Sequence, residues 1–474
     1  MVKLAAVILA AGKSTRMKSR MSKVVFPLAG RPLISYSVNA AKSLGANPIL
    51  VVAGPDQNDV EVIVKEMGAR LVYQREALGT AHAVLTARKA LSQFSGHVLI
   101  LCGDVPLIRC QTLETFVHHV INERATCGVL TMELQESGAY GRIIRDLDGC
   151  VTRIVEAVDA KGDDLAVREV NTGIFCVEKT WLYQTLKKIE PKNQKKEYYL
   201  TDIIHYAIRE GQKIVAVKGK DPREFLGINT RADLAEVSKM MRERINLQHM
   251  LAGVGIVEPS QTYIDADVKI GADTTIWPNT FLIGKTMVGD GCTIENGVVI
   301  KDAKVGDGVH IKSCTVIEES AIGKDAVVGP FSRIRPASLI GRGVRIGNFV
   351  EIKKSELLDG AKANHLSYLG DAHVGARVNI GCGTITCNYD GINKHRTIIE
   401  EGAFIGSDTQ FVAPVRIGKN ATIGAGSTIT KDVPPEALAL SRAPQVIVKN
   451  WRPKNKANKA SKASKASKAS KLQY

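Results

Sequence analysis

Two short segments in the first quarter of the chain carry side chains that could bind phosphate and a metal ion. The first, LAAGKSTRM at 9–17, directly follows an apolar run, and Lys23 lies six residues further on. Backbone N–H groups of a glycine-containing turn can cradle phosphates, and Lys13, Arg16 and Lys23 add positive charge. The spacing is neither GxxxxGK[ST] nor GxGxxG, so a solvated basic loop stays open as the alternative.

The second segment, CGDVP at 102–106, also follows an apolar run. A carboxylate at the end of a strand is well placed to hold Mg²⁺ against phosphates, which makes Asp104 a candidate metal ligand. Aspartate is also common in turns and at the start of helices, so a structural role for Asp104 stays open.

The elements that would position these residues follow from hydrophobic patterning. Short apolar runs predict buried strands, and the segments between them predict helices. The predicted strands are Ala5–Ala11, Pro48–Ala53, Arg70–Tyr73 and His97–Cys102, then interrupted strands near Ala125–Glu133, Ile143–Arg145 and Thr172–Val177; the predicted helices are Pro32–Leu44, Asp56–Met67, Thr80–Phe94 and a connecting helix, Asp233–Met250. This alternation indicates a doubly wound, Rossmann-like α/β sheet with a mixed extension that covers a substrate.

From about residue 264 the aliphatic residues recur every six positions. The runs are Val288, Ile294 and Ile300; Ile322, Val328, Ile334, Ile340, Ile346 and Ile352; and Ile399, Ile405, Phe411, Ile417, Ile423 and Ile429. A period of six fits neither an α-helix nor one continuous strand, but it is typical of a hexapeptide parallel β-helix. The pattern stops between Ile380 and Ile399, where CNYDGINKH at 387–395 predicts an external loop, either functional or a plain insertion.

Composition excludes several classes of protein. The 474 residues are 45% hydrophobic and 24% charged, which is typical of a soluble protein of two or three domains. No apolar run approaches the roughly 20 residues of a membrane span. The nine cysteines include no CxxC pair, which argues against a disulfide scaffold or zinc site and favours a reducing cytosol. The run Leu4–Ala11 resembles a secretory segment, but without a cleavage pattern a buried strand explains it better.

Half of the net charge of +16 lies in residues 452–474, which hold Arg452 and seven lysines without any acid. We expect the tail, 453–474, to be disordered, because its KAS repeats cannot bury enough apolar surface to offset the entropy of ordering. Its lysines could attract nucleic acid or an anionic membrane surface. A solvated tail explains them as well, so the charge gives no reason to expect nucleic-acid binding.

Together these motifs resemble the bacterial family of bifunctional N-acetylglucosamine-1-phosphate uridyltransferases and glucosamine-1-phosphate N-acetyltransferases. The first half shares with sugar-1-phosphate nucleotidyltransferases the motifs LAAGKSTRM, GDVP at 103–106, EA at 156–157, NTG at 171–173 and GIN at 227–229. The second half carries the most specific motifs, NFVEIK at 348–353, HLSYLGD at 365–371 and GTITCNYDG at 383–391. The resemblance covers about residues 4–452. It implies a nucleotidyltransferase domain at 1–230, a linker helix at 231–251 and a left-handed β-helix acetyltransferase domain at 252–452.

For the first half, the resemblance implies transfer of UMP from UTP to N-acetylglucosamine-1-phosphate, with release of pyrophosphate. Arg16 and Lys23 would stabilise phosphate charge as catalytic residues, and Asp104 and Asn229 would hold Mg²⁺. The implied UTP and UDP-N-acetylglucosamine site is Leu9, Ala10, Ala11, Gly12 and Lys23 on the nucleotide, Gln74, Gly79 and Thr80 at uracil, Gly141, Glu156 and Asn171 at the sugar, and Asn229. Three positions depart from the family pattern: Ser14 replaces a glycine, Ser22 a proline, and Cys102 a residue that is often tyrosine.

For the second half, the resemblance implies acetyl transfer from acetyl-CoA to the amine of glucosamine-1-phosphate. A histidine with a pKa near 6.5 suits the general base, and the resemblance selects His365 among ten histidines. Lys394, in the external loop, would reach the sugar phosphate from a neighbouring subunit. The backbone N–H of Cys382, where the family often has alanine, would polarise the thioester carbonyl. The implied glucosamine-1-phosphate site is Arg335, Lys353, Tyr368, Asn379 and Lys394, and the implied acetyl-CoA site is Cys382, Asn388, Tyr389, Ser407, Ala425 and Arg442.

The resemblance therefore implies a homotrimeric enzyme that makes UDP-N-acetylglucosamine for the cell wall and lipopolysaccharide, and the cysteine usage favours a cytoplasmic location. UTP and acetyl-CoA are the expected co-substrates and Mg²⁺ the expected cofactor. Two alternatives stay open: a single-activity sugar-1-phosphate nucleotidyltransferase with a structural or regulatory β-helix, and a non-catalytic assembly protein. The first would not require the motif around His365, and the second would not require Arg16, Lys23 and Asp104.

Overall fold

The computed structural model describes residues 3–12 and 14–451. Lys13 of the phosphate loop and the tail 453–474 lie outside the described residues. The chain forms two compact units, of which the first ends at Asp325 and the second begins at Ala326. This division falls inside the hexapeptide segment, whereas the predicted linker 231–251 coincides with a single helix, α7 (Arg231–Leu251).

A mixed nine-stranded sheet forms the centre of the first unit. Its main path is β11-β7-β10-β6-β1-β4-β5, with β8 paired to β10 and β9 paired to β8. The strands are β1 (Leu4–Leu9), β4 (Ile49–Ala53), β5 (Arg70–Tyr73), β6 (His97–Cys102), β7 (Cys127–Glu133), β8 (Arg142–Arg145), β9 (Val151–Val155), β10 (Glu169–Glu178) and β11 (Ile214–Lys218), and a separate hairpin is formed by β2 (Pro27–Leu28) and β3 (Arg31–Pro32). Strands β1, β4, β5 and β6 run parallel, whereas β10 is antiparallel to both β6 and β7, which confirms the predicted mixed extension.

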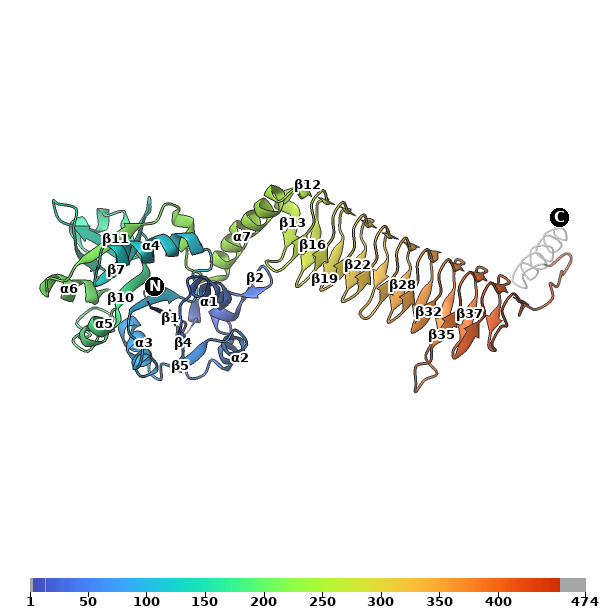
Figure 1. Cartoon of the computed structure of the whole chain (residues 1–474), viewed down its shortest axis with the longest axis horizontal. Helices are drawn as coiled ribbons and strands as arrows, with labels where there is room; N and C mark the ends of the chain where they lie inside the picture. Colours follow the sequence, from blue (N-terminus) through green and yellow to red (C-terminus); the bar gives the residue numbers. More distant parts are fainter. Residues whose placement is uncertain (1–2, 13, 452–474) are drawn as a thin grey trace, which may run out of the picture. The chain divides into compact units, whose positions relative to one another are not determined.

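Helices cover both faces of this sheet. Because successive side chains of a strand point to opposite faces, Ala6 and Ile8 of β1 enter one core while Ala5 and Val7 enter the other. The first core includes side chains of α1, α2 and α4, and the second includes side chains of α3, α5 and α6; Figure 1 shows where these helices lie along the sheet. The helices are α1 (Leu33–Ser43), α2 (Asn58–Glu66), α3 (Thr80–Thr86), α4 (Cys110–Asn122), α5 (Lys179–Thr185) and α6 (Asp202–Arg209), with short 3₁₀ helices η1 (Thr15–Met17), η2 (Lys23–Val25), η3 (Ala87–Leu91), η4 (Gly162–Ala166), η5 (Pro222–Phe225) and η6 (Pro259–Gln261).

One predicted helix differs from the structure. Thr80–Phe94 was expected to be continuous, but α3 ends at Thr86 and the chain continues as η3. The Thr86 hydroxyl donates to the carbonyl of Ala83 at 2.6 Å. Such back-bonding competes with the α-helical hydrogen bonds and favours a change of helix type.

Short parallel strands build the rest of the first unit. They form three sheets, ordered β12-β15-β18-β21, β13-β16-β19-β22 and β14-β17-β20-β23. Their bounds are β12 (Gly255–Ile256), β13 (Thr262–Ile264), β14 (Lys269–Ile270), β15 (Thr275–Ile276), β16 (Thr280–Ile283), β17 (Met287–Val288), β18 (Thr293–Ile294), β19 (Val299–Lys301), β20 (Lys304–Val305), β21 (His310–Ile311), β22 (Val316–Glu318) and β23 (Ala321–Ile322).

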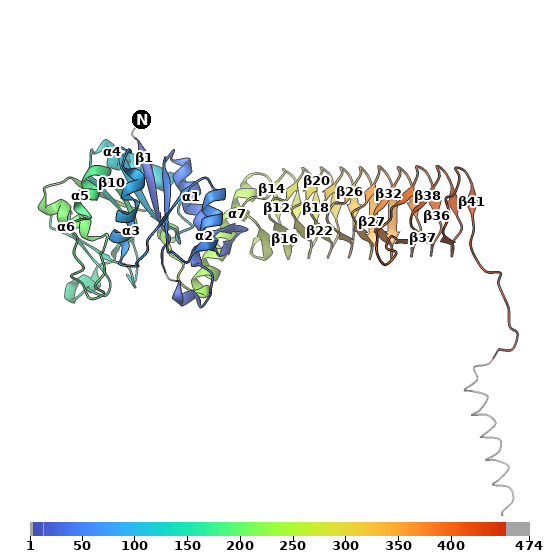
Figure 2. The same ribbon diagram turned by 90° about the horizontal axis from the view of Figure 1, so that it is seen from below.

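The second unit repeats this arrangement, with sheets ordered β24-β27-β30-β33-β36-β39-β41, β25-β28-β31-β34-β37-β40 and β26-β29-β32-β35-β38 (Figure 2). The bounds are β24 (Val327–Val328), β25 (Arg333–Ile334), β26 (Leu339–Ile340), β27 (Arg345–Asn348), β28 (Glu351–Lys353), β29 (Glu356–Leu357), β30 (Lys362–His365), β31 (Tyr368–Gly370), β32 (Ala372–Val374), β33 (Asn379–Ile380), β34 (Ile385–Cys387), β35 (Thr397–Ile399), β36 (Phe404–Ile405), β37 (Gln410–Val412), β38 (Val415–Ile417), β39 (Thr422–Ile423), β40 (Thr428–Ile429) and β41 (Leu438–Ala439).

The aliphatic residues at the predicted six-residue spacing are buried, as a β-helix core requires. In the runs from Ile322 to Ile352 and from Ile399 to Ile429, every one of them is buried. The predicted fold class, a nucleotidyltransferase-type α/β sheet followed by a left-handed parallel β-helix of hexapeptide repeats, is therefore confirmed. Within the described part of the chain, no helix combines the length and the apolar character needed to cross a membrane.

The predicted external loop lies between β34 and β35. It is a short hairpin closed by an antiparallel bridge between Tyr389 and Lys394, and it projects from the stacked coils (Figure 1). The Asp390 carboxylate accepts hydrogen bonds from the backbone of Ile392 and Asn393 and from the ring of His395. The Asn393 amide above all, with His395, lowers the pKa of Asp390 to about 2, so an ionised carboxylate organises the hairpin.

Two candidate functional sites

The predicted phosphate loop lies at the carboxyl edge of the central strands. Leu9, the last residue of β1, is aligned with Cys102, the last residue of β6. The backbone N–H of Gly103 donates to the carbonyl of Leu9 at 2.9 Å, so the two chain segments leave the sheet together. The turn 9–12 and Asp104 therefore lie at the edge where doubly wound sheets bind ligands.

Four of the predicted side chains converge beyond this edge. The Lys23 ammonium forms an ion pair with the Asp104 carboxylate and donates to the Asn229 amide oxygen at 3.1 Å. The Arg16 guanidinium donates to the same amide oxygen at 2.9 Å. The side chains of Lys23 and Asp104 are only 16% and 20% exposed. The Arg16 and Lys23 side chains thus contact one amide oxygen, and Lys23 also contacts one carboxylate, in a half-buried site.

Two serines hold the loop that carries Lys23. Ser14 has a left-handed backbone (φ 54°), and its hydroxyl accepts a hydrogen bond from the Lys23 backbone N–H at 2.9 Å. The buried Ser22 hydroxyl accepts from the Gln57 side-chain amide at 3.1 Å, and that amide also donates to the carbonyl of Gly12 at 3.3 Å. Both departures from the family pattern are therefore integrated into the loop. Sequence analysis missed Gln57, because no motif connects it with the loop.

The start of helix α7 positions Asn229. The Asp233 carboxylate accepts hydrogen bonds from the backbone N–H groups of Asn229 (2.9 Å) and Thr230 (2.8 Å). The Thr230 hydroxyl in turn accepts from the Asp233 backbone at 3.1 Å, which completes a capping box. The N–H of Ile228 donates to the Asp104 carbonyl at 3.0 Å. One set of hydrogen bonds therefore fixes the linker helix and brings Asn229 to Asp104.

A cavity of about 650 Å³ opens beside the phosphate loop, and its lining includes Ala11 and Gln74. Gln74 is buried, and its side-chain amide donates to the carbonyl of Gly79 at 3.1 Å and contacts a ring nitrogen of His82 at 3.0 Å. The volume lies within the range typical of small-ligand sites.

Gly79 and Thr80 lie where α3 begins, next to the segment that precedes α6. Gly79 has a φ of 117°, and a Cβ there would lie 2.5 Å from the carbonyl oxygen of Tyr198, so only glycine fits. The Thr80 hydroxyl accepts a hydrogen bond from the backbone N–H of Leu200 at 2.9 Å. Both predicted uracil-site residues are thereby fixed to residues 198–200.

The three predicted sugar-site residues are brought together by β8, β9 and β10. The Asn171 N–H donates to the carbonyl of Gly141 at 2.8 Å, and a Cβ on Gly141 would lie 3.6 Å from the carboxyl carbon of Glu156. The Thr201 hydroxyl, which sequence analysis missed, donates to Glu156 at 3.0 Å. Burial raises the pKa of Glu156, and burial together with Glu156 raises the pKa of Asp202 to about 6.

Cys102, the third departure from the family pattern, is a structural thiol in this geometry. Burial above all, and then Asp104, raises its pKa to about 12, so the thiolate form is suppressed. Its Sγ lies 3.8 Å from the carbonyl of Gly173, where the pairing register of β10 is irregular. The thiol therefore packs at the end of β6 against β10.

The second site lies in the second compact unit, where three predicted cations gather. Arg335 donates to the Glu351 carboxylate at 2.9 Å. The Lys394 ammonium, and next to it Arg335, lower the pKa of Lys353, so these side chains lie close together. Lys394, from the hairpin between β34 and β35, lies beside Lys353 of the same chain. The approach of Lys394 to the sugar phosphate of a neighbouring subunit stays a prediction.

His365 begins a column of predicted residues at one corner of successive coils. The register aligns His365 with Asn348 on the preceding coil. The registers of β30, β33, β36 and β39 place Cys382, Ser407 and Ala425 at the equivalent corner of the following coils. Since neighbouring strands lie about 4.8 Å apart, the column from His365 to Ala425 is about 14 Å long.

Tyr368 and Asn379 occupy the two faces that meet at the His365 corner. Tyr368 is on β31, and its hydroxyl lies over Gly370, where a Cβ would approach it to 2.4 Å. Asn379 is on β33 of the adjacent sheet. Both side chains are half-buried, whereas His365 is exposed.

The remaining acetyl-CoA candidates are placed less uniformly. A Cβ on Gly426 would lie 3.5 Å from Cδ of Arg442, which brings Arg442 to the end of the column at Ala425. The buried Asn388 donates its side-chain amide to Asp371 at 2.6 Å, and the exposed Tyr389 donates its hydroxyl within the hairpin. Among the described residues, no hydrogen bond joins Asn388 or Tyr389 to the column.

Two family models match the chain. A model described as MobA-like NTP transferase domain matches residues 6–147, within the α/β part of the first unit. A model described as bacterial transferase hexapeptide (six repeats) matches residues 267–302, 320–354 and 396–431.

Curated proteins called "Bifunctional protein GlmU" match over nearly the whole chain. The protein of Geotalea daltonii is 50% identical over 458 residues, which covers 96% of this chain and 100% of the relative. That of Geobacter sulfurreducens is 50% identical over 467 residues, with coverages of 95% and 98%. That of a Geobacillus species is 45% identical over 451 residues, with the same coverages.

Proposed function

The chain belongs to the family of bifunctional GlmU proteins, and from that membership we propose how its residues divide two reactions between two sites. It is a bifunctional transferase of UDP-N-acetylglucosamine synthesis. It acetylates glucosamine-1-phosphate with acetyl-CoA, and it transfers UMP from UTP to N-acetylglucosamine-1-phosphate with release of pyrophosphate. The product serves cell-wall synthesis. Because the bifunctional relatives match over nearly the whole chain, neither a single-activity enzyme nor a non-catalytic assembly protein describes it.

Uridyl transfer takes place at the edge formed by β1 and β6. The sugar phosphate attacks the α-phosphorus of UTP in line, and pyrophosphate leaves. Such a step needs positioning and charge neutralisation rather than covalent help from the protein. Arg16 and Lys23 stabilise negative charge on the phosphates, and the turn from Leu9 to Gly12 binds the nucleotide. The convergence of Arg16, Lys23, Asp104 and Asn229 is the observation that carries this proposal.

The residues at this place fit a magnesium ion. Mg²⁺ is usually held by one or two carboxylates, other oxygen ligands and substrate phosphates. Asp104 supplies a carboxylate and Asn229 an amide oxygen, and the Lys23 ammonium lies against both, so the pair already attracts a cation. Among the described residues no group of three or more His, Cys, Asp and Glu side chains could hold a metal alone, so phosphates would complete the ligand set. When bound, Mg²⁺ neutralises charge on the phosphate oxygens.

The nucleotide and sugar residues determine what is bound. In the cavity beside the loop, Gln74 offers an amide to uracil, and Gly79 and Thr80 shape the start of α3 around the base. Glu156 and Asn171 accept hydrogen bonds from sugar hydroxyls, and Gly141 leaves room for the ring. Thr201 holds the Glu156 carboxylate, so we add it as a positioning residue.

Acetyl transfer takes place at the His365 corner. His365 removes a proton from the substrate amine as the amine attacks the thioester carbonyl. Arg335, Lys353 and Lys394 bind the sugar phosphate by charge-assisted hydrogen bonds. Their clustering brings like charges together, since Lys394 lowers the pKa of Lys353, and a dianionic phosphate would offset this repulsion. Tyr368 and Asn379, on the two adjoining faces, bind the sugar.

The column that starts at His365 gives acetyl-CoA a direction. The backbone N–H of Cys382 polarises the thioester carbonyl one coil beyond the base, and Ser407 and Ala425 line the path of the pantetheine arm. Arg442, at the end of the column, binds a coenzyme A phosphate. Asn388 and Tyr389 contact the coenzyme from the hairpin, which requires their side chains to turn from their present partners.

We propose a homotrimer on the evidence of an apolar ladder in the second unit. Phe331, Phe349 and Leu366 lie on successive coils and are 50%, 58% and 59% exposed. The rings of Phe331 and Phe349 are stacked with centroids 5.5 Å apart. A contiguous exposed apolar patch favours an interface between proteins. Light scattering after size exclusion should give three times the chain mass, and Phe331→Ser with Phe349→Ser should lower it.

We place the enzyme in the cytoplasm, since UTP and acetyl-CoA are made there. Cell fractionation should recover both activities in the cytoplasmic fraction. Recovery in an envelope fraction would contradict this location.

The activities of the purified chain test the function most simply. With Mg²⁺ present, acetyl-CoA and glucosamine-1-phosphate should release free thiol, and UTP with N-acetylglucosamine-1-phosphate should release pyrophosphate. Chelation of the metal should stop the second signal and leave the first. Absence of the thiol signal in a folded, trimeric preparation would contradict the assignment of the second site.

A further inference from the structure

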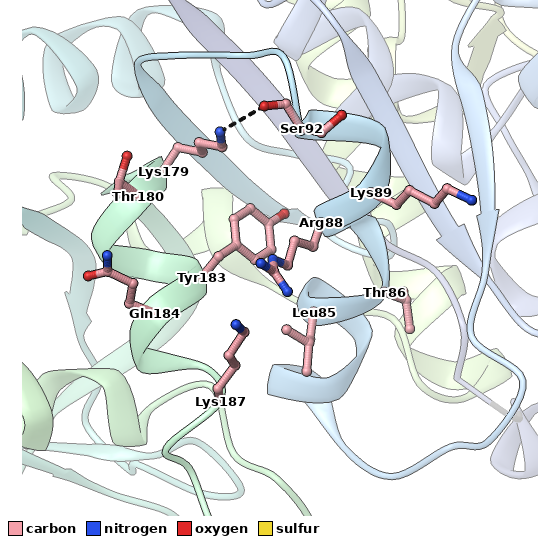
Figure 3. A pocket seen from close by; sticks show the side chains of 10 residues that line it. All are labelled: Leu85, Thr86, Arg88, Lys89, Ser92, Lys179, Thr180, Tyr183, Gln184 and Lys187. Atoms are coloured by element: carbon pink, nitrogen blue, oxygen red, sulfur yellow. Dashed lines mark hydrogen bonds between the residues drawn. The ribbon is translucent and has the colours of Figure 1, made fainter.

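A second cavity of the first unit lies apart from both sites. Its volume is about 710 Å³, and it shares no lining residue with the nucleotide cavity. One wall is the end of α3 with η3, and the other is α5 with the residues that follow it (Figure 3). A volume of this size accommodates a small ligand.

The lining of this cavity is strongly cationic. Arg88 and Lys89 come from η3, Lys179 begins α5, and Lys187 follows it. No aspartate or glutamate occurs among the described residues that line it, and none of the four cations forms an ion pair with a described residue. Lys179 makes only a long hydrogen bond of 3.3 Å, to the Ser92 carbonyl, which Figure 3 shows across the top of the cavity. Four cationic residues therefore line one hollow without a counter-ion among the described residues.

Tyr183 adds a buried hydroxyl at the same place. The residue is 4% exposed, and its hydroxyl has no hydrogen-bond partner among the described residues. Burying a hydroxyl without a partner is unfavourable, so such groups usually find an acceptor. The ring extends from α5 toward the wall that carries Arg88 (Figure 3). Burial raises the pKa of the phenol and Arg88 opposes this, so the group is a neutral donor beside a cation.

The backbone N–H groups at the N-terminus of helix α5 are not available to bind a ligand. The Glu178 carboxylate accepts hydrogen bonds from the backbone N–H groups of Thr180 (2.9 Å) and Trp181 (2.7 Å). Those amides are therefore used, and a ligand would be bound by side chains alone. Lysine and arginine side chains in this number are typical of phosphate recognition.

We propose that this cavity binds a small polyphosphate, a ligand with two or three linked phosphates. Arg88, Lys89, Lys179 and Lys187 neutralise its charge, and the Tyr183 hydroxyl donates to a phosphate oxygen. The several negative charges of such an anion match the four cations, and its oxygens supply the acceptor that Tyr183 lacks.

Calorimetric titration with inorganic tripolyphosphate tests the proposal. The full chain would carry Arg16→Ala, Lys23→Ala, Lys353→Ala and Lys394→Ala, in buffer with EDTA, so that phosphate binding at both reaction sites is weakened. One binding event with a Kd below about 1 mM is expected. Adding Lys179→Gln with Lys187→Gln should weaken it at least tenfold. Adding Tyr183→Phe, which preserves the ring and the fold, should weaken it several-fold.

A matched control removes the same charge elsewhere. Lys42→Gln with Lys239→Gln changes two exposed lysines that do not line the cavity, and it should leave the affinity unchanged. Absence of binding in the starting variant would overturn the proposal, and so would equal weakening by the control pair. The proposal would also be overturned if the chain did not bind tripolyphosphate and the cavity lysines were needed only for binding to oligonucleotides or anionic vesicles.

Discussion

Replacing Ser14 by alanine should slow uridyl transfer and leave acetyl transfer unchanged. The Ser14 hydroxyl accepts a hydrogen bond from the backbone N–H of Lys23 at 2.9 Å, and Lys23 contacts Asp104 and Asn229. Loss of one such hydrogen bond costs about 0.5–1.5 kcal/mol. At about 1.4 kcal/mol per factor of ten, the expected fall in kcat/KM for UTP is roughly two- to twelvefold.

Ser14→Gly separates the hydrogen bond from the backbone conformation. It removes the same hydroxyl but relaxes the φ of 54°, which costs a residue with a side chain about 1 kcal/mol. The two variants should therefore show the same fall in kcat/KM. The free energy of unfolding should be about 1 kcal/mol higher for the glycine variant than for the alanine variant.

Pyrophosphate release at low UTP measures the rate, and thermal unfolding measures the stability. Ser19→Ala is the matched control, because the Ser19 hydroxyl accepts a backbone hydrogen bond of 3.1 Å in the same loop, from Met21 rather than Lys23. An unchanged kcat/KM for Ser14→Ala, or an equal loss for Ser19→Ala, would refute the role given to Ser14.

Three further predictions concern the other parts of the two sites. Gly79→Ala should destabilise the first unit by about 1–3 kcal/mol and raise KM for UTP, because its Cβ would lie 2.5 Å from the Tyr198 carbonyl oxygen. Lys394→Ala should raise KM for glucosamine-1-phosphate about tenfold or more and raise the pKa of Lys353, measurable by NMR of the labelled amine. Asp202→Asn should raise thermal stability at pH 8 by about 1–2 kcal/mol and not at pH 4, because burial raises the pKa of Asp202 to about 6.

The sign of the last effect follows from which form the fold prefers. A carboxyl whose pKa is higher in the folded than in the unfolded chain binds its proton more tightly when folded. Its contribution to stability is therefore lost as the pH rises from about 4 to about 6, and partial exposure of Asp202 limits the loss. Equal stabilisation by asparagine at pH 4 and pH 8 would contradict this reasoning. An unchanged KM for UTP in Gly79→Ala would contradict the role given to Gly79, and an unchanged pKa of Lys353 in Lys394→Ala would contradict the closeness of the two lysines.

The sequence predicted best the features that repeat. Each hexapeptide contributes one inward aliphatic residue, so the positions from Ile322 to Ile352 could be assigned to the core without any tertiary information. Seven of the nine strands in the α/β sheet were also found, because their buried runs are short and bounded by turns, whereas β9 and β11 were not predicted. Helix α4 carries a readable apolar spacing at Leu113, Phe116, Val117 and Val120 but was not predicted. Helices α5 and α6 have only seven and eight residues, about two turns, which is too short for periodicity.

The site was predictable where a motif contains the residue and not where packing supplies it. Asp104 and Asn229 belong to motifs, and the structure brings them together with Lys23. Gln57 and Thr201 lie in segments without a motif, and only folding places their side chains against Ser22 and Glu156. Sequence alone could not show this, because those contacts join residues 35 and 45 positions apart.

The most direct test of the two-site account compares Asp104→Ala with His365→Ala in both assays. Each variant would first be shown to be folded and of wild-type mass in solution. The account predicts that Asp104→Ala loses pyrophosphate release from UTP and keeps thiol release from acetyl-CoA, whereas His365→Ala does the reverse. Loss of both activities in either folded variant would contradict the assignment of the two reactions to separate sites.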